Sequence, residues 1–185
     1  MERILIFGSI VAAVWFIVIY FLPYMVMSVF KKAILVKGFG EGPIPINTLY
    51  TQPEGQFADP LHSSGSRLTI TGVNRDTIIT IGWLDLSKEP LILRVPDMSD
   101  RYFSVQFTDP LKNTVFAYVG KRVTGTEAGA YLICGPGFKG EVPSGVSRIS
   151  SPNNSVLIVC RVLVSDESDI PVAYRFSKQL QLSPL

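Results

Sequence analysis

The sequence has few of the residues that most often carry protein chemistry. Histidine occurs once, at His62 in a Pro- and Ser-rich stretch, where a solvated surface residue is more usual than a catalytic base. No G-x-S-x-G motif is present, and the glycine-containing stretch "CGPGFKG" lacks the spacing of a phosphate-binding loop and is typical of a turn. These absences argue against a histidine-dependent hydrolase and against a phosphate-loop enzyme.

Cysteine is also scarce. Cys134 and Cys160 each lie in an apolar, strand-like run, without a CxxC pair or a Cys–His cluster. We predict two small buried side chains, and a disulfide between neighbouring strands is the alternative if the domain lies outside the cytoplasm. The sequence therefore predicts no metal site and no cofactor.

Charged residues are few, and most of the chain has no strong excess of either sign. They make up 17% of the sequence, and the formal net charge is +2. Residues 1–37 carry four Lys or Arg and one Glu, so the remainder has a net charge of −1. A nearly neutral domain has no broad basic face, and nucleic acid is therefore not an expected partner.

The amino end contains the longest uncharged stretch. Residues 4–22 contain no charge, and as a helix they would span about 28 Å, close to the hydrocarbon core of about 30 Å. Uncharged sequence continues to Phe30, so the helix is expected to kink at Pro23 or to extend beyond the bilayer. A cleaved signal peptide would need a shorter apolar region followed by paired small residues, which are missing. We therefore predict a single-pass anchor within residues 1–37, with the lipid bilayer as a partner.

Two changes of composition divide the rest of the chain. Residues 38–66 are rich in Gly, Pro and Ser, which predicts a linker that becomes an extended segment lying on the domain. Residues 67–185 contain short runs with the alternation of β-strands, such as "TIITIGWLDL" and "RYFSVQFTDP", separated by turn residues. The run "SVLIVCRVLV" is apolar nearly throughout, as expected of a central strand. The predicted fold is mainly β, an antiparallel, jelly-roll-like β-sandwich.

The tail "SDESDIPVAYRFSKQLQL" predicts one short C-terminal helix. Ser168 or Asp169 would cap it, Pro171 would fall in its first turn, and Lys178 would lie toward its end.

Aspartates at the predicted strand ends are the best catalytic candidates. Acid–base chemistry of the glycosidase type needs two carboxylates about 5–10 Å apart. Turns also use aspartate to bind their own backbone, and we favour that role here. The aspartates concerned are Asp76, Asp85, Asp97, Asp100 and Asp109.

The stretch "NRDT" places an amide, a guanidinium and a carboxylate in a row before a strand. Arg75 could bind an anionic ligand in bidentate fashion. The alternative is an Asx-type turn with an internal Arg–Asp network, which the residues alone favour.

Ordered blocks in residues 70–164 resemble the domain-of-unknown-function-1254 family. They are NRDT, WLDLS, VPD followed by RY, S, Q and TD, then TGT, GPGFKG and SPN. The chain departs from the family at "KRVTGT", where an Arg-Thr-Thr run is usual, and at Phe138, where Trp is common. The signature polar and aromatic positions of the family are occupied here by Asn74, Arg75, Asp76, Trp83, Asp85, Tyr102, Gln106 and Asp109.

The resemblance implies a β-rich domain that is often secreted or anchored facing out of the cytoplasm, and it supplies no reaction. Many members carry a second, 1214-family domain that this chain is expected to lack, so a separately encoded 1214-family protein is an expected partner. The lysines after the apolar segment favour a cytoplasmic domain by the charge rule. We follow the resemblance instead, and expect a bacterial cytoplasmic membrane protein with a periplasmic domain.

Two functions are compatible with these observations. The first is a membrane-anchored binding module, such as an accessory subunit of a membrane protein complex. Its ligand-binding candidates are Asn74, Arg75, Asp76, Trp83, Tyr102 and Gln106. The alternative is a membrane-tethered, carboxylate-based hydrolase of an envelope or small-molecule substrate, with Asp76 and Asp85 as catalytic residues. A carrier of an apolar ligand is a third possibility, and it would need a wide apolar cavity.

Overall fold

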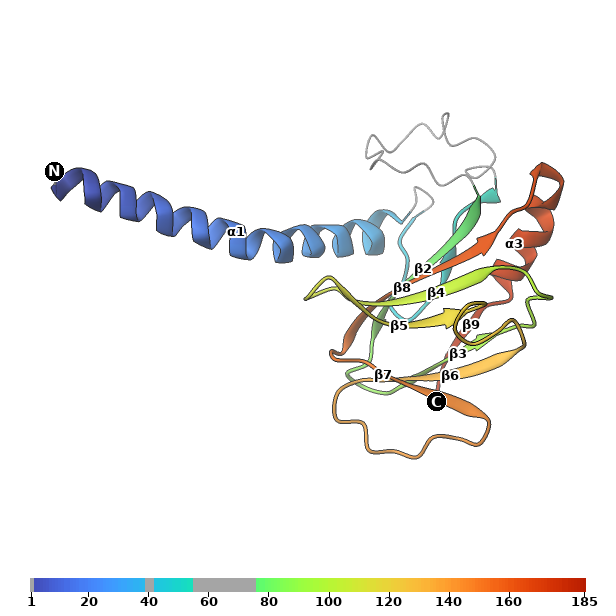
Figure 1. The fold of residues 1–185 in the computed structure, drawn as a ribbon. Helices are drawn as coiled ribbons and strands as arrows, with labels where there is room; N and C mark the ends of the chain where they lie inside the picture. Colours follow the sequence, from blue (N-terminus) through green and yellow to red (C-terminus); the bar gives the residue numbers. More distant parts are fainter. Residues whose placement is uncertain (1, 39–41, 55–75) are drawn as a thin grey trace.

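Residues 2–38, 42–54 and 76–185 are described by the computed structural model, in which two packed β-sheets form a domain and a long helix projects from it (Figure 1). One sheet has the strand order β1-β2-β8-β4-β5, formed by Tyr50–Thr51, Thr77–Asp85, Ser155–Leu163, Phe103–Asp109 and Thr114–Gly120. The other has the order β7-β6-β3-β9, formed by Val146–Ser150, Gly129–Cys134, Leu91–Val95 and Gln181–Pro184. The predicted mainly β sandwich is confirmed, although β6 and β7 pair in parallel.

Side-chain alternation along the strands explains the two layers. On β4, Phe103, Val105 and Phe107 are buried, whereas Ser104 and Gln106 lie on the opposite face. β8 lies between β2 and β4, which confirms the central position predicted from its apolar sequence. The core between the sheets includes Ile78, Leu84, Phe107, Ile158 and Cys160 of the first sheet and Leu91, Leu93, Tyr131, Ile133 and Ile149 of the second.

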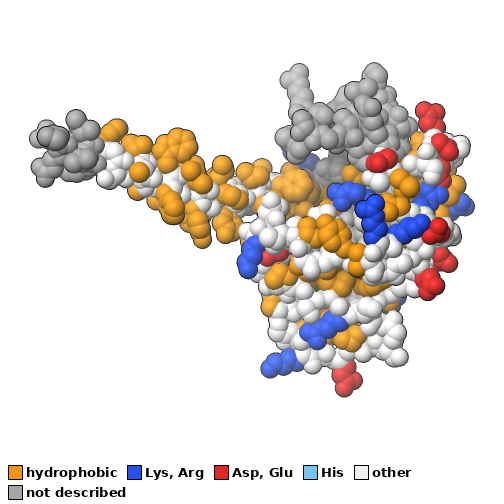
Figure 2. All heavy atoms as spheres, viewed as in Figure 1, with side chains coloured by type: hydrophobic (Ala, Val, Ile, Leu, Met, Phe, Trp, Pro, Cys, Tyr) orange, Lys and Arg blue, Asp and Glu red, His pale blue; other side chains and the backbone are white. Residues whose placement is uncertain are grey.

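The helix α1, Glu2–Lys37, is one continuous element with Pro23 inside it. It continues through Pro23 beyond residues 4–22, as expected from the uncharged sequence up to Phe30, and extends further to Lys37. Among the described residues it is the one helix that is long and apolar enough, by length and composition, to cross a membrane. All side chains from Phe7 to Val26 are exposed, and Figure 2 shows this part of the helix covered with hydrophobic side chains.

The last turns of α1 pack on the outer face of the five-stranded sheet. Nζ of Lys31 lies 5.3 Å from the centre of a Trp83 ring. The predicted linker also contributes here, because its residues 42–54 lie along the domain and include β1. The buried residues of this outer cluster are Ile34, Ile44, Ile81, Trp83 and Leu157.

The side-chain cap at the C-terminal helix comes from a residue that lies just before the two that the sequence predicts. A 3-10 turn, Glu167–Asp169, precedes α3, Ile170–Lys178. The carboxylate of Asp166 caps this turn by accepting hydrogen bonds from the backbone N–H groups of Ser168 and Asp169. Asp169 occupies the N-cap position of α3, as one of the two predicted alternatives, but its side chain makes no capping hydrogen bond, and Ser168 lies within the preceding turn.

The predicted helix is also too long. Residues Gln181–Pro184 form β9, which pairs with β3 at the edge of the four-stranded sheet. Pairing with β3 stabilises the extended backbone of these residues. Four residues are too few to show a strand pattern in the sequence.

Both cysteines are free and buried, and they lie in different layers. Cys160 faces the core between the sheets, whereas Cys134 belongs to a cluster with Ile92 and Leu132 on the four-stranded sheet. Burial raises the pKa of the Cys134 thiol, and it raises the pKa of the Cys160 thiol to about 12.

We expect neither thiol to react with a maleimide in the folded chain at neutral pH. The thiolate is the reactive species, and burial both excludes the reagent and suppresses ionisation. Both thiols should react once the chain is unfolded in urea, and mass spectrometry of the adducts measures this. Rapid modification of the folded chain would contradict the burial of these side chains.

Candidate functional site

Among the described residues, one half of the outer face of the five-stranded sheet is covered and the other half is open. The end of α1 and residues 42–54 cover the side formed by β1 and β2. On the other side, the register places Ser104 opposite Arg161 of β8, and Gln106 opposite Tyr118 of β5. These side chains share the open face because alternate residues of a strand point the same way.

A hollow of about 370 Å³ lies over this open half. It brings together two of the predicted ligand-binding residues, Tyr102 and Gln106, which lie on the same face at the start of β4. The polar and aromatic side chains that line the hollow are Tyr102, Ser104, Gln106, Tyr118, Arg122 and Arg161.

The hollow is basic and has an aromatic wall. Cζ of Arg122 lies 5.3 Å from the centre of the Tyr102 ring. Within the described part of the chain, neither Arg122 nor Arg161 forms an ion pair with a carboxylate. The Tyr118 hydroxyl donates a hydrogen bond of 3.4 Å to Oε1 of Gln106. Two guanidinium groups without a carboxylate partner among the described residues, one of them over the Tyr102 ring, are suited to an anionic group of a ligand or partner.

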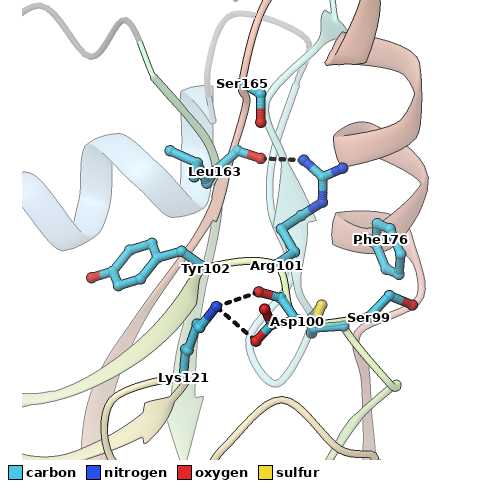
Figure 3. Close-up of a pocket in the computed structure, with 9 residues that line it drawn as sticks. Ser99, Asp100, Arg101, Tyr102, Lys121, Leu163, Ser165 and Phe176 are labelled. Atoms are coloured by element: carbon cyan, nitrogen blue, oxygen red, sulfur yellow. Dashed lines mark hydrogen bonds and ion pairs between the residues drawn. The ribbon is translucent and has the colours of Figure 1, made fainter.

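A second hollow adjoins the first at Tyr102, but its charged groups are already paired. Figure 3 shows Lys121 pointing at Asp100, whose carbonyl and carboxylate oxygens lie 2.6 and 2.7 Å from its Nζ. Arg101 points toward α3 and donates to the two carboxylate oxygens of Asp169 at 2.5 and 2.7 Å. These internal pairs indicate that the second hollow contributes to stability.

The Arg101–Asp169 pair shifts both pKa values in the direction that favours the charged forms. The hydrogen bond from Arg101 is the largest effect on Asp169 and lowers the pKa of that carboxyl below its ordinary value. The hydrogen bond to Asp169 likewise raises the pKa of Arg101. Both groups are therefore ionised at neutral pH, and neither is suited to proton transfer there.

The two carboxylates of the hydrolase alternative lie at opposite ends of one strand. Asp76 precedes β2 and Asp85 ends it, so at about 3.3 Å per residue they are about 30 Å apart. Hydrogen bonds from Ser87 lower the pKa of Asp85, which holds a turn. Asp76 and Asp85 therefore do not form an acid–base pair with each other, since that chemistry needs about 5–10 Å.

The other aspartates serve separate turns. Oδ1 of Asp97 accepts a hydrogen bond of 2.7 Å from the N–H of Ser99. Oδ1 of Asp109 accepts one of 2.9 Å from the N–H of Leu111. Asp97 and Asp109 thus both have the predicted role, in which aspartate binds the backbone of its own turn.

Trp83 does not line the hollow. It is buried under α1 rather than between the sheets, and its Nε1–H donates to Oγ of Ser155 at 2.8 Å. The ligand-binding candidate Trp83 therefore lies outside the hollow, because the end of α1 covers the outer face of β2. Three other residues singled out from the sequence lie outside the described residues: His62, Asn74 and Arg75.

A model of the family described as "Protein of unknown function (DUF1254)" matches residues 55–184, more than half of the chain. The chain belongs to the DUF1254 family. Among solved structures, the VPA0106 protein from Vibrio parahaemolyticus is similar to this chain, with a TM-score of 0.65 and 25% sequence identity. The match covers 90% of this chain but 36% of VPA0106, so the chain spans about a third of that protein's length. No curated protein sequence matches the chain.

The hollow of this DUF1254 domain contains two residues that the sequence patterns did not indicate, Arg122 and Arg161. Arg161 is the one charged residue of the central strand β8, and a charge within an apolar run could have drawn attention to it. Arg122 lies in the turn after β5 and carries no such signal. Within the described residues, no group of three or more His, Cys, Asp or Glu could hold a metal ion.

Proposed function

We propose that this DUF1254 protein is a single-pass membrane protein whose β-sandwich is a binding module for a partner protein. One observation carries the anchoring: the exposed, apolar part of α1 runs from Phe7 to Val26. At about 1.5 Å per residue this part is about 30 Å long, which equals the hydrocarbon thickness of a bilayer. In water such a surface would be unfavourable, and lipid is the solvent that suits it.

The open half of the outer sheet face is the proposed binding surface. Its unpaired Arg122 and Arg161 would receive carboxylate groups of the partner, with Tyr102 and Tyr118 as the aromatic surroundings. Arginine and tyrosine are the residue types enriched at protein interfaces. The absence of an assembled pair between Asp76 and Asp85 favours binding over the hydrolase alternative.

The partner is a membrane protein complex that contains a separately encoded 1214-family protein. The support for this partner is the resemblance to the DUF1254 family, which implies that a 1214-family domain accompanies the DUF1254 domain in many members. Following the family resemblance, we place the complex in the bacterial cytoplasmic membrane with the DUF1254 domain on the periplasmic side.

Purification of the tagged full chain from native membranes in mild detergent is expected to recover a stoichiometric partner. Replacing Arg161 with Glu should lower the recovery about tenfold or more, because one charge-assisted contact is worth about 1.5–3 kcal/mol. Quantitative mass spectrometry of the eluate measures the ratio of partner to bait.

The matched control is Lys139→Glu, which makes the same charge reversal at an exposed position in the β6–β7 connection. This variant should recover the partner as the wild type does. A monomer under all detergent conditions, or equal recovery with both variants, would refute the proposed binding surface.

A further inference from the structure

The sandwich begins where the exposed part of α1 ends. From Phe7 onward, Met27 is the first residue of the helix that is partly buried, and it packs against the outer cluster of Ile34 and Trp83. No spacer separates the proposed span from the domain. If residues 7–26 cross the bilayer, the sandwich must therefore lie directly at the membrane surface.

The contacts of α1 determine which end of the sandwich faces the bilayer. Lys31 lies over Trp83 near the end of β2. Ile34 follows Lys31 along the helix and belongs to the same cluster as Ile81, which is earlier in β2. The helix thus runs antiparallel to β2, and its preceding residues extend past the Asp85 end of the sheet.

Several turns meet at this end. Asp85 pairs with Ser155 at the start of β8, and β4 ends on the same side at Asp109, which pairs with Thr114. The β4–β5 turn, residues 110–113, therefore points in the direction in which the N-terminal half of α1 projects, as Figure 1 shows.

The β4–β5 turn presents a hydrophobic residue and a cation to the outside. Leu111 is 53% exposed although it is large and apolar, and Lys112 beside it is also exposed. Lys88, in the β2–β3 connection that begins at the same end of the sheet, is exposed as well. An apolar side chain beside a lysine is a composition suited to the interface of an anionic bilayer.

A buried carboxylate holds this turn in place. Asp109 is fully buried, and its Oδ1 accepts hydrogen bonds from the N–H groups of Leu111 at 2.9 Å and Lys112 at 3.4 Å. Its Oδ2 accepts a hydrogen bond of 2.6 Å from Nδ2 of Asn153, in the turn before β8. The backbone that presents Leu111 is therefore fixed to the sandwich.

We infer that the β4–β5 turn is a second membrane contact, with Leu111 in the interfacial region and Lys112 at anionic headgroups. This inference rests on the proposed anchoring by α1. Together the helix and the turn would fix the tilt of the domain on the bilayer. The buried Asp109, a signature position in the resemblance to the family, would then serve to hold the contact residues in position.

Environment-sensitive labels on single introduced cysteines test the inference. The full chain is reconstituted in phosphatidylcholine–phosphatidylglycerol vesicles as Leu111→Cys, Val123→Cys or Ile17→Cys and labelled with a nitrobenzoxadiazole. Val123 is the matched control, since it is 65% exposed in the turn at the other end of β5. Ile17 reports insertion of α1, and the labelled wild type gives the background from Cys134 and Cys160, which are buried.

The label at position 111 should show a blue-shifted emission and loss of intensity with nitroxide-headgroup lipids, and the label at position 123 should show neither. If position 17 is quenched by bilayer nitroxides but position 111 behaves like position 123, the second contact is refuted and the anchoring stands. If position 17 itself remains in water, the anchoring fails, and the second contact fails with it.

Discussion

Replacing Arg101 with Met is expected to lower the free energy of unfolding by about 2–4 kcal/mol. Arg101 joins the start of β4 to the C-terminal segment: it donates to both carboxylate oxygens of Asp169 and, at 2.7 Å, to the carbonyl oxygen of Leu163. The two side chains of the pair are only 16% and 14% exposed. Methionine keeps much of the side-chain volume, so the decrease in the free energy of unfolding reports mainly the loss of the hydrogen bonds and of the charge.

Urea unfolding of the full chain in detergent micelles, followed by tryptophan fluorescence, measures this change. Arg175→Met is the matched control, because Arg175 is an exposed residue of α3. It should change the free energy of unfolding by less than about 0.5 kcal/mol. Equal stability of the two variants would show that the Arg101–Asp169 pair contributes nothing beyond ordinary surface charge.

The pH dependence of the folding stability distinguishes the contribution of the ion pair from that of side-chain packing. The pKa of Asp169 is lower in the folded state than its ordinary value of 3.8, so the pair stabilises the fold above that value. This contribution is lost as the pH falls through the folded-state pKa of Asp169. The difference in stability between wild type and Arg101→Met should therefore be full at neutral pH and shrink below about pH 4.

The strands with the clearest patterns could be predicted because their burial follows from local alternation. β2, β4 and β8 have long two-residue repeats or continuous apolar runs, and each is a strand in the structure. β9 could not be predicted, since its four residues follow a helix and become a strand by pairing with β3. The parallel pairing of β6 with β7 likewise depends on the path of the chain between them.

The candidate site likewise depends partly on local alternation, which the sequence shows, and partly on the register between strands, which it does not show. Alternation alone places Tyr102 and Gln106 on one face, and the structure puts them in one hollow. Arg161 lines this hollow because β8 pairs with β4. That pairing joins segments far apart in the sequence, so it could not be predicted from local patterns. By contrast, strand rise alone separates Asp76 from Asp85 by about 30 Å, so their distance could have been inferred from the sequence.

The layer in which Trp83 lies could not be predicted, because alternation shows that a face is apolar but not what covers it. A strand whose two faces are both apolar can be covered by the other sheet on one side and by a helix on the other. Here the last turns of α1 cover the face that carries Ile81 and Trp83. The apolar helix therefore has two roles along its length, and the second was not evident from its hydrophobicity.

Replacing Trp83 with Ala is expected to lower the free energy of unfolding by about 3–5 kcal/mol and to release the end of α1 from the sandwich. Trp83 is 2% exposed, packs against Ile34 and Ile44, and binds Ser155 through its indole N–H. Alanine leaves a cavity between helix and sheet and removes the ring beneath Lys31. Hydrogen exchange of residues 27–37 should increase more than exchange of β4 and β8, because the lost contacts lie at the helix.

Trp83→Phe is the matched variant, because it keeps an aromatic ring in the cluster and removes the indole hydrogen bond. It should cost about 1–2 kcal/mol and leave the helix in place. In vesicles, Trp83→Ala should also abolish the interfacial signal of a label at position 111 while a label at position 17 stays in the bilayer. That combination is expected only if the packing of α1 on Trp83 sets the orientation of the domain. Unchanged signals at both positions would show that the β4–β5 turn binds the membrane independently of the helix.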